Sequence, residues 1–271
     1  MHFDQPSGII TLTTDFGLRD PFVGVMKGAI LSRFRAACIV DLTHDILAHW
    51  PAEAGFWLNR SFEYFPRGTL HVSVVDPGVG TARELLAVQA RGHLMLAPDN
   101  GLLAEVIDAI PQAQVIRIDA AALASLGLRA ASATFHGRDI FAPLAAELAS
   151  GRLRPEALGS PTTQFVPSWL EAVVVARDCV SGVIVTVDHF GNLLTNIDAK
   201  WLAPMVEPHV YAGHQILPVR RTYAEAKPGE NLALINSFGV LEIACAEGHA
   251  ADKMGLSRGA PVSVRDAVRH R

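Results

Sequence analysis

Cysteine is scarce in this sequence, whose 271 residues contain only Cys38, Cys179 and Cys245. The three lie far apart, form no Cys-x-x-Cys pair, and as an odd number cannot all pair within one chain. This excludes a disulfide framework and a cysteine-rich zinc site. It also favours a reducing compartment.

Basic runs and long apolar segments are missing as well. The formal net charge is -4 and no cluster of Lys and Arg occurs, so nucleic acid is not an expected partner. No uninterrupted apolar stretch approaches the roughly 20 residues of a membrane-spanning helix. The N-terminal stretch 1–6 has neither the basic start nor the apolar segment of a signal peptide. We therefore expect a cytoplasmic protein that does not associate with membranes.

Two nucleotide-binding motifs are also lacking. No Gly-x-Gly-x-x-Gly follows the first predicted strand, and no Gly-x-x-x-x-Gly-Lys occurs anywhere in the chain. The glycine-rich turns that bind a pyrophosphate or a triphosphate through backbone N–H groups are therefore absent. A dinucleotide-binding or triphosphate-binding protein is not expected.

What the sequence does contain is enough apolar material for two domains. Hydrophobic residues make up 50% of the chain and charged residues 18%, which excludes global disorder. Apolar runs alternate with helical periodicity in the first part of the chain, which predicts an α/β domain with a mostly parallel sheet over residues 1–160. Its first elements are strands at 8–14, 37–40 and 69–75 and helices at 20–35 and 51–65.

The pattern changes after residue 167. Residues 151–167 are rich in Pro, Gly, Ser and Thr and lack periodicity, so we interpret them as a linker. Short apolar runs separated by turns follow, with little helical periodicity. They predict a smaller antiparallel β-barrel or sandwich over residues 168–271.

Asp76 is the residue around which the sequence motifs are organised. It follows the apolar run 69–75, and a Pro-Gly-Val-Gly turn at 77–80 leads on to Arg83. In open α/β sheets, ligands bind beyond the carboxyl ends of the strands, which is where this pattern puts Asp76. A surface Asp–Arg pair in a structural turn would give the same pattern. The motif alone leaves both interpretations open.

Asp15 and His136 are two further candidates in the first domain. Asp15 ends the first strand, where a carboxylate can accept both hydroxyls of a ribose, although turns and helix caps use aspartate in the same way. His136 lies in a Phe-His-Gly-Arg-Asp segment at 135–139, before a predicted helix. Its imidazole can act as a base or an orienting group near neutral pH. A structural role for this single histidine stays open.

A metal site is a weaker alternative in the same domain. His44, Asp41 and Asp45 could combine with Asp15 and Asp139 as ligands. No His-x-x-x-His pair or comparable ligand spacing supports such a site. We therefore expect no metal and no cofactor.

Polar turns in the second domain supply candidate binding residues. Asp188 and Asn192 lie in a glycine-containing turn, where they could bind an ammonium group and a base or carboxylate. The Asn-Ser-Phe-Gly turn at 236–239 could offer a hydroxyl and backbone donors to a carboxylate. Trp50 and Tyr223 could stack on an adenine or ribose face. Hairpin turns and core aromatics account for these residues equally well.

Five segments in matching order nevertheless resemble the S-adenosylmethionine hydrolases (hydroxide adenosyltransferases), relatives of the bacterial fluorinase and chlorinase. The similarity extends from about residue 8 to residue 265. It is carried by Thr-Asp-Phe-Gly at 14–17, Val-Asp-Pro-Gly-Val-Gly at 75–80 with Arg83, Phe-His-Gly-Arg-Asp at 135–139, Phe-Gly-Asn at 190–192 with Thr195 and Asn196, and Asn-Ser-Phe-Gly at 236–239 with Leu-Glu-Ile-Ala at 241–244.

The resemblance implies a homotrimer that hydrolyses S-adenosylmethionine to adenosine and methionine, with each site between the first domain of one subunit and the second domain of its neighbour. It implies that Asp76, Arg83 and His136 activate the water. The implied substrate-binding residues are Asp15 at the ribose hydroxyls with Phe16 beside it, Trp50 at the nucleoside, Asp188 and Ser237 at the amino and carboxylate ends of methionine, Asn192 on the adenine side, and Tyr223 and Phe238.

The sequence departs from the halogenating relatives at positions that decide the nucleophile. Those enzymes have a tyrosine at the position of Asp76 and a Tyr-Ser pair at positions 136–137, and arginines replace Phe238 and Cys245. An anionic Asp76 would repel a halide but accept a hydrogen bond from water. Hydrolysis is therefore favoured. The alternatives are a halide-using adenosyltransferase, a module that binds adenosine or S-adenosylmethionine without turnover, and a metal-dependent hydrolase.

Overall fold

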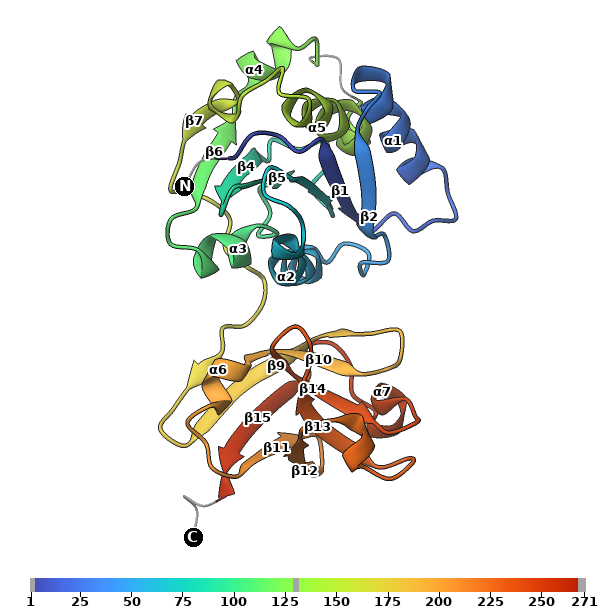
Figure 1. Cartoon of the computed structure of the whole chain (residues 1–271), viewed down its shortest axis with the longest axis vertical. Helices are drawn as coiled ribbons and strands as arrows, with labels where there is room; N and C mark the ends of the chain where they lie inside the picture. The colour runs from blue at the N-terminus through green and yellow to red at the C-terminus, as the bar shows by residue number, and fades with distance from the viewer. Residues whose placement is uncertain (1–2, 129–131, 268–271) are drawn as a thin grey trace. The chain divides into compact units, whose positions relative to one another are not determined.

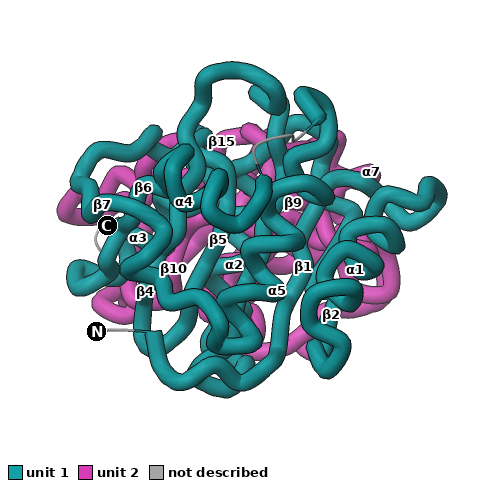
Figure 2. Tube along the Cα trace, turned by 90° about the horizontal axis from the view of Figure 1, so that it is seen from above, with its two compact units in different colours: residues 1–169 teal, residues 170–271 magenta. Residues whose placement is uncertain are grey.

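A computed structural model describes residues 3–128 and 132–267 of the chain and divides it into two compact units, residues 1–169 and 170–271 (Figure 1, Figure 2). Met1 and His2 of the N-terminal stretch considered above, and residues 268–271 of the predicted second domain, lie outside the described residues. Within the described ranges, no helix combines the length and the apolar character needed to cross a membrane.

Unit 1 is built on a sheet whose described strands follow the order β2-β1-β3-β5-β4-β6-β7. The pairs β1–β2, β1–β3 and β3–β5 are parallel, and the remaining pairs are antiparallel. This confirms the predicted α/β class with a sheet that is mostly parallel at its centre. The strands are β1 (Ile9–Thr14), β2 (Cys38–Thr43), β3 (Leu70–Val74), β4 (Leu85–Ala90), β5 (His93–Pro98), β6 (Gln114–Ile118) and β7 (Gly159–Pro161).

Helices cover both faces of this sheet (Figure 1). Side chains alternate between the faces of a strand, so Leu94 and Leu96 of β5 join one hydrophobic core while Met95 and Ala97 join the other. Because both faces are buried, the strands are almost continuously apolar. The first core contains α1 (Phe22–Arg33) and α5 (Ala142–Ala149), and the second contains α2 (Pro51–Ser61) and α3 (Ala104–Ala109).

Two local features differ from the sequence-based expectations. The sequence suggests Asp20 as the N-cap of α1, but the helix starts at Phe22 with Pro21 in the cap position and no side-chain capping bond. Part of the predicted linker also joins unit 1, because β7 pairs with β6 and extends the sheet. The other helical turns of this unit are η1 (Phe62–Tyr64), α4 (Ala120–Ser125), η2 (Gly137–Phe141) and η3 (Pro155–Ala157).

The topology of the sheet explains where a site can form. The chain leaves β1 through α1 in one core and reaches β3 through α2 in the other, so a reversal of direction occurs between these neighbouring strands. Such a reversal leaves a crevice beyond the carboxyl ends of the two strands. The register pairs Thr14 with Val74. Asp15 and Asp76 therefore leave the sheet at adjacent strand ends.

A buried pair of histidines lies on the same sheet. His71 Nδ1 is 2.8 Å from the Thr11 hydroxyl, and its Nε2 is 3.2 Å from His93 Nδ1. His71 is fully buried, and its burial, followed by the charge of a protonated His93, lowers its pKa to about 3. The folded protein therefore holds His71 neutral.

This burial predicts a loss of stability in acid. Because the pKa of His71 is lower in the folded than in the unfolded protein, its contribution is complete above about pH 6.5 and is lost as the pH falls towards about 3. The slope for one proton is about 1.4 kcal/mol per pH unit. We expect His71→Gln to flatten this dependence in urea unfolding at pH 7, 6 and 5. The matched control His214→Gln changes an exposed histidine, and an equal flattening there would contradict the assignment.

Unit 2 is a closed barrel. Its described strands form the sheet β10-β14-β13-β12-β11-β15-β9-β8, and β9 also pairs with β10, which closes seven of them into a ring with β8 outside it. This confirms the predicted barrel-like β domain, but one pair is not antiparallel, because β12 and β13 run parallel. The elements are β8 (Val174–Val175), β9 (Cys179–Val187), β10 (Leu193–Asp198), α6 (Ala199–Leu202), β11 (Pro208–Ala212), β12 (Gln215–Arg220), η4 (Tyr223–Glu225), β13 (Asn231–Ile235), β14 (Val240–Cys245), α7 (Ala250–Met254) and β15 (Pro261–Asp266).

Candidate active site

The turn after β3 brings Arg83 back towards Asp76. The Thr81 hydroxyl donates to the Gly78 carbonyl oxygen at 2.7 Å and accepts from the Arg83 N–H at 3.3 Å, which closes the loop. Gly80 has a φ of +79°, and a Cβ at this position would lie 2.3 Å from the carbonyl oxygen of Ala133. A side chain at position 80 would therefore collide with the segment that leads to His136.

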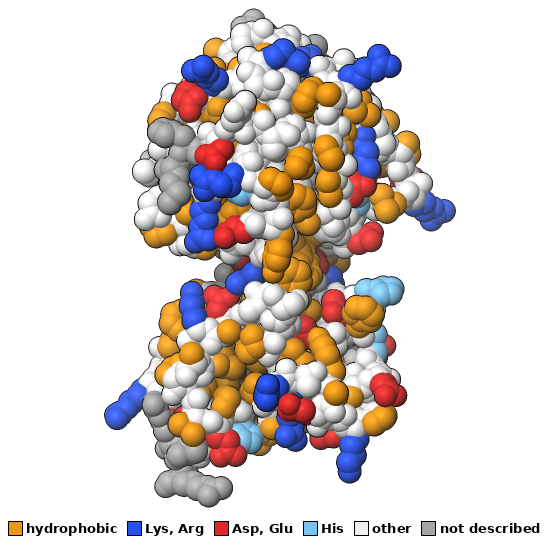
Figure 3. Space-filling model, viewed as in Figure 1, with side chains coloured by type: hydrophobic (Ala, Val, Ile, Leu, Met, Phe, Trp, Pro, Cys, Tyr) orange, Lys and Arg blue, Asp and Glu red, His pale blue; other side chains and the backbone are white. Residues whose placement is uncertain are grey.

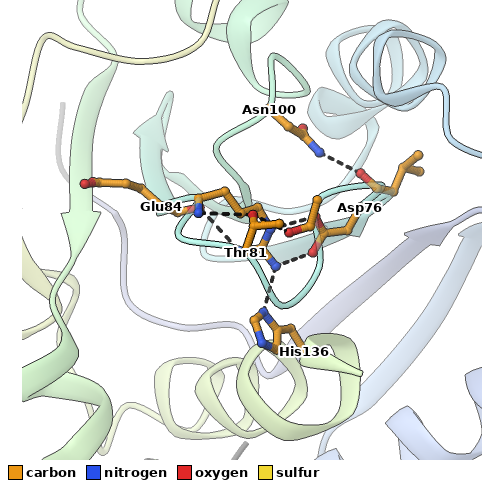
Figure 4. Close-up of polar contacts among 8 residues, drawn as sticks. Asp76, Thr81, Glu84, Asn100 and His136 are labelled. Atoms are coloured by element: carbon orange, nitrogen blue, oxygen red, sulfur yellow. Dashed lines mark hydrogen bonds and ion pairs between the residues drawn. The ribbon is translucent and has the colours of Figure 1, made fainter. Parts of the chain in front are cut away.

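Asp76, Arg83 and His136 form one connected group (Figure 4). Arg83 Nε donates to Asp76 Oδ1 at 2.6 Å, and one terminal nitrogen of the same guanidinium donates to Asp76 Oδ2 and to His136 Nδ1, the latter at 2.8 Å. The side chains of Asp76 and Arg83 are only 5% and 9% exposed. The structure thus supports a buried bidentate pair at this turn rather than a surface pair.

These contacts fix the protonation pattern of His136. A guanidinium has donors and no acceptor, so His136 Nδ1 must accept, and the proton of the neutral ring is on Nε2. Burial, together with the positive charge of Arg83, lowers the pKa of His136, while Asp76 and Asp139 oppose this effect. A neutral ring with its proton on Nε2 can donate a hydrogen bond to a ligand. It cannot accept a proton there.

Asp76 and His136 lie in the wall of a cavity of about 660 Å³. Asp15 also lines it, and Oδ2 of this carboxylate accepts the backbone N–H of His49 at 3.0 Å. Most of the lining area is apolar, which suits a ligand with a flat, weakly polar part. The other lining residues are Phe16, Phe22, Ala48, His49, Val74, Val79, Ser132, Thr134, Phe135, Gly137 and Arg138.

An aromatic cluster forms one part of this wall. The rings of Phe16, Phe22 and Phe135 meet edge to face, with centroids 5.5–6.1 Å apart. Phe16 and Phe135 belong to sequence motifs, whereas Phe22 was not singled out from the sequence. Phe22 is the first residue of α1 and reads as an ordinary helix residue. The sequence feature that could have pointed to Phe22 is its position directly after Asp20 and Pro21, at the start of the predicted helix.

Trp50 follows the lining residue His49 in the chain, and its place at the nucleoside stays a prediction. Its ring packs edge to face against Trp169 at 5.7 Å, and among the described residues it is not one of the side chains that line the cavity. Arg83 is also outside this lining and borders an adjacent cavity of about 380 Å³, which His136 shares. Unit 1 therefore brings together Asp15, Phe16, Asp76 and His136, with Arg83 behind them.

The candidate residues of unit 2 gather at turns of the barrel. Asp188 Oδ1 accepts the backbone N–H groups of Phe190 and Asn192 at 2.9 and 2.8 Å, and its Oδ2 accepts from Asn192 Nδ2 at 3.0 Å. Tyr223 donates its hydroxyl to Glu242 Oε1 at 2.6 Å. These contacts order the turn between β9 and β10 and tie Tyr223 to β14.

Glu242 is a polar residue that the sequence motifs did not mark as functional. It is 3% exposed, and Asn236 Nδ2 donates to its Oε2 at 3.1 Å. Burial and the nearby charge of Asp188 raise its pKa, while hydrogen bonds from Tyr223 and Asn236 oppose the rise. Burial, followed by interactions with Glu242, also raises the pKa of Tyr223.

The turn at 236–239 contains one residue that forms the turn and one that is exposed. Asn236 Oδ1 accepts the backbone N–H groups of Phe238 and Val240 at 2.9 and 3.3 Å, which makes Asn236 a turn-forming residue. Ser237 between them is exposed. The serine hydroxyl is thus presented at the surface of unit 2 by a turn that its neighbour holds.

The five acidic and histidine residues of the metal alternative do not come together as a ligand set. His44 Nδ1 is 2.8 Å from the Thr14 hydroxyl, and its Nε2 is 3.1 Å from Asp41 Oδ1. Asp139 instead pairs with Arg138. In the described part of the chain, no group of three or more His, Cys, Asp or Glu residues is arranged to hold a metal ion.

The fold and this site define a two-domain enzyme class with an α/β unit followed by a β-barrel, and comparison with known proteins identifies the family. Residues 10–159 match the model of the SAM hydroxide adenosyltransferase N-terminal domain, and residues 182–263 match that of the C-terminal domain. The chain belongs to the SAM hydroxide adenosyltransferase family.

Several named relatives match nearly the whole chain. The (R)-S-adenosyl-L-methionine hydrolase of Thermus thermophilus is 38% identical over 92% of this chain and 96% of its own length. The protein of that name from Salinispora tropica is 35% identical over 94% and 96%. A fluorinase from Actinopolyspora mzabensis is 26% identical over 94% and 96%.

A solved structure supports the fold at similar coverage. The crystal structure of an uncharacterized conserved protein from Thermotoga maritima superposes with a TM-score of 0.85 at 31% identity. It covers 94% of this chain and 99% of the other. The order of α/β unit and barrel is thus shared along the whole length.

Proposed function

We propose that this protein hydrolyses S-adenosyl-L-methionine to adenosine and L-methionine. The observation that carries the proposal is the group formed by Asp76, Arg83 and His136 in the wall of a cavity that also contains Asp15. The relatives named (R)-S-adenosyl-L-methionine hydrolase support the same reaction.

The substrate needs little help from an acid. Its sulfonium leaves as the neutral thioether of methionine, so no proton has to be delivered to the leaving group. The requirement is a water molecule held in line with the bond from sulfur to the ribose 5′ carbon. Holding both reactants in this arrangement contributes up to about 7–11 kcal/mol.

The contacts of the site support a part for each residue in the step that we propose. His136 donates its Nε2–H to the oxygen of the water, because Arg83 occupies Nδ1. Asp76 accepts a hydrogen bond from the same water and takes its proton as the new C–O bond forms and the C–S bond breaks. Arg83 holds the carboxylate and the imidazole in place. Assistance of this kind contributes about 10²–10⁴-fold.

We also propose that a neighbouring subunit completes the site within a cytoplasmic homotrimer. Asp188, Asn192, Tyr223, Ser237 and Phe238 of its barrel would hold the methionine ends and the adenine side. Large apolar side chains exposed on each unit support an assembly, among them Phe22 at 46%, Phe190 at 71% and Val206 at 77%. Hydrophobic side chains, in orange, reach the surface of both units on the face drawn in Figure 3. A solution mass near three times 29.1 kDa is expected, and a fully active monomer would contradict this arrangement.

Product analysis in heavy-oxygen water tests the reaction. Purified protein mixed with S-adenosylmethionine in H₂¹⁸O should release adenosine and methionine in equal amounts, with one ¹⁸O in the adenosine and none in the methionine. Added chloride or fluoride should yield no 5′-halogenated nucleoside, because the Asp76 carboxylate repels an anion. Tight binding of adenosine with no release of methionine would instead identify a binding module. Loss of turnover with a chelator would identify a metal-dependent enzyme.

A further inference from the structure

We propose that His44, acting through Thr14, is a positioning residue for Asp15. The inference rests on the proposed function, in which Asp15 binds the ribose hydroxyls. The three residues lie at the carboxyl ends of the adjacent parallel strands β1 and β2, whose register pairs Thr13 with Thr43. Thr14 and His44 are the residues that come next along the two segments, so they lie side by side at the end of the sheet. Asp15 comes directly after Thr14.

A chain of four polar contacts runs from Lys27 through Asp41, His44 and Thr14 to the turn that contains Asp15. Lys27 donates to Asp41 at 2.6 Å, and Asp41 is 3.1 Å from His44 Nε2. His44 Nδ1 is 2.8 Å from Thr14 Oγ1, and this oxygen accepts the backbone N–H of Phe16 at 3.2 Å. The chain begins at a partly exposed lysine and ends on the peptide that follows Asp15.

The contacts of Thr14 hold whichever ring nitrogen of His44 carries the proton. The Thr14 oxygen accepts the N–H of Phe16 in either case, and its contact with His44 Nδ1 is made with the hydroxyl as donor or with the ring N–H as donor. Thr14 therefore bridges the imidazole and the peptide that follows Asp15.

Backbone hydrogen bonds also join the segment that follows β1 to the segment that follows β2. The Gly17 N–H donates to the His44 carbonyl oxygen at 2.8 Å, and the Ile46 N–H donates to the Thr14 carbonyl oxygen at 3.4 Å. The His49 N–H donates to the Asp15 carboxylate. The turn that follows β1 and the segment that follows β2 are therefore held together on both sides of Asp15.

The burial of His44 supports a positioning role over a packing role. The side chain is 3% exposed, and Thr14 is fully buried. Burying polar groups costs free energy unless they are hydrogen-bonded, so apolar residues would fill this space at lower cost. The polar pair does what an apolar pair cannot: it fixes the peptide beside Asp15 and so aims the carboxylate into the cavity.

A comparison of two nucleosides tests this role. Adenosine has both ribose hydroxyls and 2′,3′-dideoxyadenosine has neither, so the ratio of their dissociation constants reports the contact of Asp15 with the ribose. We expect Thr14→Val to weaken adenosine binding about 10-fold and to change dideoxyadenosine binding less than about 2-fold. The reason is that a misplaced Asp15 carboxylate loses its charge-assisted contact with the ribose hydroxyls, which only adenosine has. Thr14→Ser keeps the hydroxyl and should preserve the wild-type ratio. Calorimetry on the full chain measures all of these values.

Variants of His44 supply the second arm. His44→Asn keeps an acceptor near the position of Nδ1 and should retain most of the discrimination, whereas His44→Leu should lose it. For turnover, we expect His44→Leu to raise KM for S-adenosylmethionine about 10-fold with kcat within about 3-fold, since the water-activating group is unaltered. A merely structural residue would lower the unfolding temperature without changing the nucleoside ratio.

The outcomes separate this inference from the proposed function. If the wild type prefers adenosine and Thr14→Val keeps that preference, the positioning role is wrong while the function can stand. If the wild type distinguishes the nucleosides but releases no methionine, hydrolysis is wrong while the positioning role stands. If the wild type does not distinguish them, Asp15 does not bind the ribose, and the inference is wrong.

Discussion

Replacing Asp76 by Asn is expected to lower kcat for adenosine release by about 10²–10⁴-fold, the range for losing a proton acceptor. The amide can still bond to Arg83, but it cannot take a proton from the attacking water. Because Asp15 and the aromatic wall are unchanged, the dissociation constant for adenosine should stay within about 3-fold. Rapid-quench assays and calorimetry measure the two quantities.

The control for this variant lies eight residues further along the chain. Glu84→Gln removes a carboxylate of the same turn region, one that is 43% exposed and pairs with Arg117. It should keep near wild-type turnover, since exposed ion pairs contribute little. If Asp76→Asn turned over as fast as Glu84→Gln, Asp76 would not be the acceptor of the water proton.

The second large effect is expected for Arg83→Met. This change removes the donor to His136 Nδ1 and leaves a buried carboxylate without its partner. We expect kcat to fall by about 10²-fold or more, similar to the loss of one preorganised donor. Breaking a buried pair also destabilises the fold by about 3–5 kcal/mol, so assays belong well below the unfolding temperature.

The pH profile identifies the cause of that loss. In the wild type, the positive charge of Arg83 helps to keep the pKa of His136 below its ordinary value, so the neutral ring persists into mild acid. Without Arg83, the charges of Asp76 and Asp139 raise that pKa. The acid limb of kcat/KM should therefore move to higher pH. Arg117→Met, which removes a partly exposed arginine, should leave the limb in place, and an unmoved limb in Arg83→Met would contradict the role of His136.

Local sequence patterns predicted the strands and helices whose side chains are buried against the faces of the sheet. The β-branched runs before Asp15 and Asp76 could be assigned to a parallel sheet because such strands are buried on both faces. The alternation of strand and helix predicted a parallel sheet, but it did not give the strand order that puts β1 beside β3. The second domain was predicted only as a barrel or sandwich. Its closure depends on β9 pairing both with β10, its neighbour in the chain, and with β15, which lies far from it in the sequence.

Other features of the site lie beyond sequence patterns. His136 is separated from Arg83 by 53 residues, and nothing in the spacing shows which ring nitrogen accepts. The packing of Trp50 against Trp169 likewise joins residues that lie far apart in the chain, which no local pattern indicates. His44 was noticed for its chemistry as a metal ligand. Its contact with Thr14 is a product of strand register, which single residues do not reveal.

The close approach at Gly80 has a consequence for how such enzymes can diversify. The backbone of the Arg83 loop approaches the backbone of Ala133 at Gly80, so the spacing between the two segments does not depend on the side chains of Asp76 and His136, to which we propose to assign the chemistry. A change of nucleophile can then arise by exchanging residues at 76 and 136 on an unaltered frame. Lengthening either segment would instead separate the reacting groups, so descendants with new reactivity should differ there by substitution and not by insertion.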